Sequence, residues 1–195
     1  MKMLIPLMMI IPILSTGCEN RKFEFVGTIN VDNTYEVDQT GFFDKLYEVS
    51  RGELLNLVDI PEDAEVTEVN VEKMLIKVIV LDDNKATTVT LSGAFDPGTG
   101  KIKLFDDYPA TLVAVDAPYM GLNDVIAEGV GRLKQKIEAV LKGKDDTGFS
   151  VWVYGDSWPT SGNRIHVNII FRISGSVKYT QCESVLFFIE GGDPC

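Results

Sequence analysis

The sequence predicts a mainly β fold: an antiparallel, β-sandwich-like domain with one amphipathic α-helix. Many short runs are rich in β-branched and aromatic residues, and several alternate between apolar and polar positions. Clusters of Asp, Asn, Gly and Pro separate these runs and supply turn chemistry. A single segment has clear helical periodicity, so we expect one helix to cover a two-sheet sandwich.

The first half of the chain contains four expected strands. They cover residues 23–31, 35–37, 66–80 and 87–95. The run 66–80 is long and β-branched, which is typical of a central strand. Turn residues at 82–85 favour a hairpin between 66–80 and 87–95. Residues 42–49 are expected to form a short helical or irregular segment.

Five further strands are expected after the turn at residues 96–100. They cover residues 101–105, 111–115, 151–154, 164–173 and 177–189. In 164–173 the apolar residues occupy every second position, which predicts one buried face and one wet face. Gly175 permits a turn, so we expect 164–173 and 177–189 to form a terminal hairpin.

The expected helix spans residues 122–142. Its apolar residues recur at steps of three and four, which places them on one stripe. Gly143 is placed to end the helix. Gly129 and Gly131 lie inside it, where each costs about 1 kcal/mol relative to alanine. We therefore expect the helix to approach a strand closely at these glycines.

The first eighteen residues have the pattern of an export signal. Lys2 precedes an apolar run over residues 3–14, which is too short to span a bilayer, and small residues lead to Cys18. This segment resembles the lipobox of bacterial lipoproteins. The resemblance implies cleavage after Gly17 and acylation of Cys18, with residues 1–17 as the signal peptide.

This resemblance also predicts how the protein is organised and where it resides. Residues 18–22 would form the lipid-anchored N-terminus, and 23–195 a single β-rich domain in the bacterial cell envelope. An Asp directly after the lipidated cysteine resembles the signal that retains lipoproteins at the inner membrane. This chain has Glu19 at that position, so the outer membrane is favoured. The bilayer is then a partner through acylated Cys18, because several buried acyl chains anchor a protein stably.

Charge and cysteine content limit which ligands, metals and disulfides this chain can be expected to have. The formal net charge is −11 with no basic block, so nucleic acid is an unsuitable partner. Cys182 and Cys195 remain if Cys18 is acylated, and an oxidising compartment favours a disulfide between them over two free thiols. One histidine and two distant cysteines do not provide a zinc site, and we expect no metal or cofactor.

Two short segments resemble those of GDSL-type (SGNH) hydrolases. Residues 155–158, Gly-Asp-Ser-Trp, follow an apolar run, as does the nucleophile turn of that family, which would make Ser157 the nucleophile. Residues 121–124 resemble its GxND block, whose Asn123 would help to form an oxyanion hole. His166 is the chain's only histidine and the only candidate base of that type.

Several features favour a non-enzymatic protein over an esterase. The serine segment follows the asparagine segment, whereas the family has the reverse order. Asn163 stands where the family has an Asp three residues before the histidine, and one helix does not build an alternating α/β fold. The alternation around His166 also places it on the solvent-facing side of its strand.

Aromatic residues supply the main indication of binding. Trp152 and Tyr154 share one side of strand 151–154, and Trp158 follows in a loop. If that side faces water, the three rings form a platform for a sugar or a partner protein; otherwise they belong to the core. We expect an envelope lipoprotein that binds protein or carbohydrate, or that acts as a structural or assembly component.

Overall fold

A computed structural model describes residues 18–61, 63–113, 117–158, 162–186 and 193–195. The expected signal peptide, residues 1–17, lies outside the described residues. The chain groups into two compact units. Among the described residues, the main unit lies within 24–181, and the second contains 18–23, 182–186 and 193–195.

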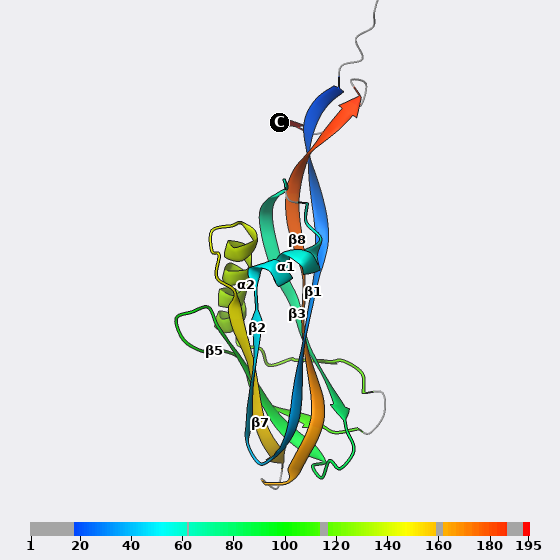
Figure 1. Ribbon diagram of the computed structural model, residues 1–195, viewed down its shortest axis with the longest axis vertical. Coiled ribbons are helices and arrows are strands. Elements are labelled where there is room, and N and C mark those ends of the chain that lie inside the picture. Colours follow the sequence, from blue (N-terminus) through cyan, green and yellow to red (C-terminus); the bar gives the residue numbers. More distant parts are fainter. Residues whose placement is uncertain (1–17, 62, 114–116, 159–161, 187–192) are drawn as a thin grey trace, which may run out of the picture. The chain divides into compact units, whose positions relative to one another are not determined.

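The structure confirms the mainly β, antiparallel fold. Its strands are β1 (Cys18–Thr40), β2 (Phe43–Val49), β3 (Glu65–Val80), β4 (Thr88–Asp96), β5 (Ile102–Thr111), β6 (Met120–Gly121), β7 (Phe149–Trp158), β8 (Arg164–Leu186) and β9 (Asp193–Pro194). Its helices are α1 (Arg51–Val58) and α2 (Ala127–Leu141). In the main unit, sheet A has the order β6-β3-β8-β1 and sheet B the order β2-β7-β4-β5 (Figure 1).

The two sheets pack on one apolar core. Along β7, Val151 and Val153 are fully buried, whereas Trp152 between them is only partly buried. The ring of Phe105 in sheet B lies 5.7 Å from that of Phe171 in sheet A, measured between centroids. Burial of side chains of this size contributes about 1.5–3 kcal/mol each, so this shared interior is the main stabilising element.

Helix α2 confirms the predicted helix and its end. It begins later than expected, at Ala127, because the Ile126 backbone N–H donates to the Leu104 carbonyl of β5 at 2.7 Å. Gly143 has φ +65° and its N–H donates to the Val140 carbonyl, which ends the helix. The close approach is confirmed at Gly129, where a Cβ would lie 2.0 Å from the Lys103 carbonyl oxygen, and is wrong at Gly131, where a Cβ would have nothing within 4 Å because this residue lies on the solvent side of the helix.

The expected hairpin between 66–80 and 87–95 is wrong. Strand β3 belongs to sheet A and β4 to sheet B, so the turn residues carry the chain from one sheet to the other. The Leu81 N–H donates to the His166 carbonyl of β8 at 2.9 Å, and Asp83 has φ +65°. The turn residues correctly indicate that the chain bends here. They do not determine which strand β3 pairs with, and its partner is β8, which is distant in sequence.

Residues 42–49 do not form a helical or irregular segment, because 43–49 form β2. Apolar residues here recur at helix-like spacing, but β2 pairs antiparallel with β7 from Phe43↔Gly155 to Val49↔Phe149. Phe43 and Val49 are buried on the inner side. Helix α1 follows at once and was not expected; the Ser50 hydroxyl accepts from the Glu53 N–H at 3.1 Å and caps it.

Gly175 does not form a turn, because it lies inside β8. A Cβ at this position would lie 2.0 Å from the Asn70 carbonyl oxygen, so the glycine lets β8 approach β3 closely. Residues 164–173 and 177–186 are therefore one strand, and 23–31 and 35–37 are likewise parts of β1. The expected strand 111–115 is reduced to the end of β5 at Thr111, and residues 114–116 and 187–189 lie outside the described residues.

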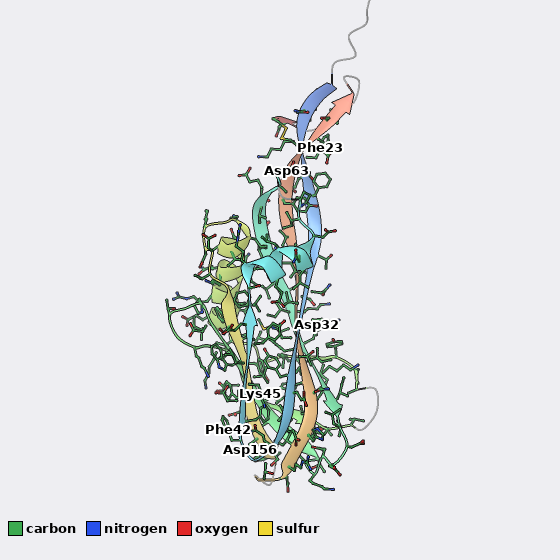
Figure 2. The ribbon with its side chains drawn as sticks, viewed as in Figure 1. Phe23, Asp32, Phe42, Lys45, Asp63 and Asp156 are labelled. Carbon is green, nitrogen blue, oxygen red and sulfur yellow. A yellow bond between two sulfur atoms is a disulfide. The ribbon has the colours of Figure 1, made fainter. Side chains whose placement is uncertain are left out.

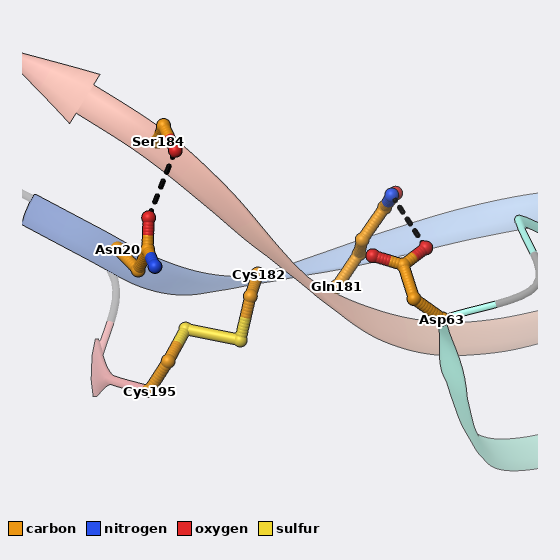
Figure 3. The surroundings of a disulfide bond; sticks show 6 residues. All are labelled: Asn20, Asp63, Gln181, Cys182, Ser184 and Cys195. Carbon is orange, nitrogen blue, oxygen red and sulfur yellow. Dashed lines mark hydrogen bonds between the residues drawn. A yellow bond between two sulfur atoms is a disulfide. The ribbon is translucent and has the colours of Figure 1, made fainter.

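The second unit contains a disulfide. Cys182 and Cys195 are bonded, with their Cα atoms 6.2 Å apart (Figure 3). Strand β9 pairs with β1 at Arg21 and Lys22. The Ser184 hydroxyl donates to the Asn20 side-chain oxygen at 2.8 Å. The disulfide and these pairings hold the last residues of the chain against β1.

The contact at Gly129 generates a matched pair of stability predictions. Gly129→Ala places a methyl group against the Lys103 carbonyl and is expected to lower the free energy of unfolding by about 1–3 kcal/mol. The Cβ added by Gly131→Ala has no neighbouring atom within 4 Å, so this substitution is expected to raise the free energy of unfolding by about 1 kcal/mol. Urea denaturation measures both values, and equal effects would show that α2 does not contact β5 as described.

The core of β1 generates a second prediction. The side chain of Asn33 is fully buried, and in the described structure neither of its polar atoms makes a hydrogen bond of normal geometry, although it interacts with the Tyr35 hydroxyl. Asn33→Leu should raise the free energy of unfolding by about 1–3 kcal/mol, because a poorly hydrogen-bonded buried amide is replaced by an apolar group. Thr34→Leu, on the exposed side of β1, is the control and should change it by less than about 0.5 kcal/mol. A destabilised Asn33→Leu protein would contradict the prediction.

Candidate functional site

The outer face of sheet B contains the candidate site. Because Val151 and Val153 point into the core, Trp152, Tyr154 and Asp156 lie on the outer face of β7. Tyr154 pairs with Ser92 of β4 on one side and with Asp44 of β2 on the other. The outer face therefore combines aromatic and polar side chains from three neighbouring strands.

One end of this face forms an open hollow of about 750 Å³. It is lined by aromatic rings, hydroxyl groups, carboxylates and backbone from β4, β5, β7 and the β1–β2 connection: Phe42, Thr90, Ser92, Asp106, Asp107, Pro109, Tyr154, Gly155, Asp156, Ser157 and Trp158. Figure 2 shows Phe42 and Asp156 close together at this end of the unit. The volume lies within the range of about 300–1,000 Å³ that is common for small-molecule sites.

The rings of the hollow face solvent. Phe42 is 61% exposed and Trp158 is 58% exposed. The Phe42 and Tyr154 ring centroids lie 6.4 Å apart with the planes tilted by 48°. Large apolar side chains at such exposure indicate a contact surface when they gather in one place.

Trp152 is separate from this group. Of the three rings in the expected platform, Tyr154 and Trp158 line the hollow, but Trp152 does not. The Lys101 ammonium lies 4.5 Å from the centroid of the Trp152 ring, at a distance typical of a cation–π contact. The structure therefore brings two of the three predicted rings together and adds Phe42.

Hydrogen bonds fix the polar side of the hollow. The Ser92 hydroxyl donates to Asp106 Oδ1 at 2.9 Å and accepts from the Asp107 N–H at 2.9 Å. Lys103 Nζ lies 2.5 Å from Asp106 Oδ2 and lowers the pKa of this carboxyl. Burial raises the pKa of the Tyr154 hydroxyl, which stays protonated at neutral pH. Asp106 is therefore ionised and held in place.

The side chains that line the hollow give it a net negative charge. Three carboxylates, those of Asp106, Asp107 and Asp156, line it, and the nearby ammonium of Lys103 pairs with Asp106. Asp156 Oδ1 accepts from the Ser157 N–H at 2.7 Å. Carboxylates accept hydrogen bonds from hydroxyl and amine donors and repel anions. The arrangement suits a neutral or cationic ligand.

The residues that resemble a hydrolase are placed apart. Ser157 is buried on the inner side of β7, and its Oγ accepts from the Asn163 N–H at 3.1 Å. His166 is on the outer side of β8, where its Nδ1 lies 2.5 Å from the Asp82 carbonyl oxygen. Asn123 is exposed in the connection between β6 and α2. The structure does not bring these three side chains together as a catalytic unit.

Phe42, Ser92 and the aspartates of β5 were not found by sequence reasoning. Phe42 lies in the connection between β1 and β2, and the pairing Phe43↔Gly155 brings it beside Tyr154. Asp106 and Asp107 lie at an irregular point of the β4–β5 pairing, where Asp107 has φ +48°. Because these contacts depend on strand pairing, no local pattern indicates them.

Other expected features have a limited structural context. Cys18 is the first residue of β1, and its acylation stays a prediction. Within the described ranges, no helix is long and apolar enough to cross a membrane. The same ranges contain no group of three or more His, Cys, Asp or Glu side chains suited to hold a metal ion.

Comparisons with known proteins do not identify a family. No family model, curated protein or solved structure matches this chain.

Proposed function

We propose that this protein is a non-enzymatic lipoprotein of the bacterial envelope that binds carbohydrate in the hollow on sheet B. The observation that carries the proposal is the group formed by Phe42, Tyr154 and Trp158 beside fixed carboxylates on paired strands. Acylation at Cys18 would hold the domain at a membrane, with the outer membrane favoured over the inner.

The chemistry of the hollow supports a sugar as the ligand. Pyranose rings have apolar C–H faces that pack on aromatic rings, and their hydroxyl groups need hydrogen-bond acceptors. The hollow offers both kinds of surface. Asp106 is held by Ser92 and Lys103 before any ligand arrives, so little ordering cost remains for this acceptor.

The charge distribution narrows the class of sugar. A uronic acid or a sulfated sugar would place an anion beside Asp106, Asp107 and Asp156. A neutral or amine-bearing sugar would instead donate hydrogen bonds to these groups. We therefore propose neutral or amino-sugar polymers of the envelope as ligands.

A non-enzymatic role accords with the surroundings of Ser157. Ser157 is among the residues that line the hollow, but it is almost fully buried, and its hydroxyl donates to Asp156 Oδ1 at 3.3 Å and accepts from the Asn163 N–H at 3.1 Å. A nucleophile must reach its substrate with its base within hydrogen-bonding distance. His166 is instead engaged with the Asp82 carbonyl on sheet A.

The anchor is tested by the intact mass of the protein extracted from bacterial membranes. The expected mass equals residues 18–195 plus acyl groups. Cys18→Ala should abolish both the acylation and the membrane retention. A soluble, unacylated product from the unchanged chain would contradict the anchor, and it would leave the carbohydrate proposal standing on the hollow alone.

Trp158→Ala should weaken binding of soluble glycans about fivefold or more, because truncation of an aromatic anchor at a contact surface costs about 1 kcal/mol or more. Isothermal titration with neutral, amino and acidic oligosaccharides measures the affinities. Leu46→Ala is the matched control, because Leu46 is exposed on the same sheet but does not line the hollow. Thermal melting should be unchanged in both variants. Equal losses in both variants, or preference for acidic sugars, would contradict the proposal.

A further inference from the structure

The free edges of the two sheets differ in how they are protected. A strand at the edge of a sheet presents a row of N–H and C=O groups that can pair with another chain. Proteins block such edges with covering elements, bulges, proline or inward-pointing charges. Sheet A ends at β1 and at β3 with β6, and sheet B ends at β2 and β5.

Three of these edges carry such devices. At β5, the Ile126 N–H bonds to Leu104, and Pro109 interrupts the row of donors. At β3, β6 pairs with two residues, the Leu122 N–H donates to the Met74 carbonyl at 3.1 Å, and register shifts disturb the strand. At β2, Lys45 (labelled in Figure 2) is half-buried and shares the inward-facing side of the strand with the buried Phe43 and Val49.

Over residues 24–40 the edge of β1 has no paired strand beyond it, no proline and no inward-pointing charge in the described structure. The end of α1 approaches its inner side, where a Cβ at Gly27 would lie 3.8 Å from the Val58 carbonyl oxygen. The side chains of β1 alternate between inward and exposed positions along the whole stretch, and it contains no lysine or arginine. In the described structure, β8 is its neighbour on one side, and β9 pairs only with Arg21 and Lys22. Along residues 24–40, no strand of the described part of the chain lies beside the opposite row of backbone groups.

The exposed side of this stretch is acidic. Asp32, Glu36 and Asp38 all lie on it. Arg172 of β8 donates to both oxygens of Asp32 at 2.5 Å, and Arg164 contacts Asp38 at 3.1 and 3.3 Å. The Tyr119 hydroxyl also donates to Asp32 Oδ2 at 3.2 Å, and the charge of Lys45 in β2 helps to lower the pKa of Asp38. Asp32 and Asp38 are therefore compensated, whereas Glu36 has no ion pair in the described structure.

We propose that the free edge of β1, residues 26–38, is an interaction surface that takes an extended, lysine- or arginine-bearing segment of a partner protein as an added strand. Backbone hydrogen bonds hold the segment, and a basic side chain of the segment lies beside Glu36, the carboxylate that β8 does not neutralise. A second copy of this chain fits poorly, because two paired β1 edges would place carboxylates against carboxylates.

The probe for this inference is a short peptide of alternating valine and lysine, capped at both ends, added to the full chain in a neutral detergent. Amide hydrogen exchange, read by mass spectrometry, should slow about tenfold or more in residues 26–38 and stay unchanged in β2. A peptide N-methylated at every second residue cannot form the ladder and should have no such effect. Binding of both peptides with equal affinity would overturn strand addition.

Charge reversal tests the class of partner. Glu36→Lys should lower the affinity for the valine–lysine peptide about tenfold and should raise the affinity for the corresponding valine–glutamate peptide. Glu48→Lys, at an exposed position of β2, is the matched control and should leave both affinities unchanged. Slow exchange in β1 that depends on protein concentration without peptide would overturn the inference in favour of self-association. None of these outcomes depends on glycan binding in the hollow.

Discussion

The packing of two antiparallel sheets on one apolar core is the constraint on which the rest of the structure depends. Side chains alternate along a strand, so each residue that the core requires to point inward forces its neighbours outward. Val151 and Val153 point inward, and the outer face of β7 therefore receives Tyr154. In β1 the same rule buries Val31 and Tyr35 and exposes the carboxylates between and beyond them. The surfaces proposed for ligand and partner both result from the demands of the interior.

The sandwich is unevenly covered. Helix α2 contacts β3, β4 and β5, and the backbone at Ile126 pairs with β5, so the edges on that side are occupied. On the side of β1 and β2 the short helix α1 lies against Gly27 and Tyr47, and the hollow opens beside the Phe42 connection between these two strands. The fold thus separates a stabilised side, which contains helix α2, from a side where surface chemistry is available for binding.

Local patterns predicted the parts of this structure that depend on local physics. The amphipathic stripe of α2, its end at Gly143 and the alternation in 164–173 are each set by neighbouring residues, and all are present. The errors concern pairing between distant segments. Glycine is common in turns, but Gly175 lies inside β8 against the Asn70 carbonyl. Residues 43–49 form a strand because they pair with β7. For the same reason, the alternation of β7 predicted Tyr154 in the hollow, whereas Phe42 and the aspartates of β5 were not predicted there. Trp158 was expected in a loop, but it is the last residue of β7 and pairs with Thr88.

The central claim is that the outer face of sheet B is open and binds ligand through Phe42, Tyr154 and Trp158. Hydroxyl-radical footprinting with and without a soluble neutral oligosaccharide tests it most directly, because oxidation of each ring is read separately. Phe42 and Trp158 should oxidise readily in the free protein, Trp152 should react more slowly beneath Lys101, and the sugar should protect the three rings of the hollow without altering Leu46. A Trp158 that resists oxidation in the free protein, or a bound sugar that protects none of the three rings, would contradict the account.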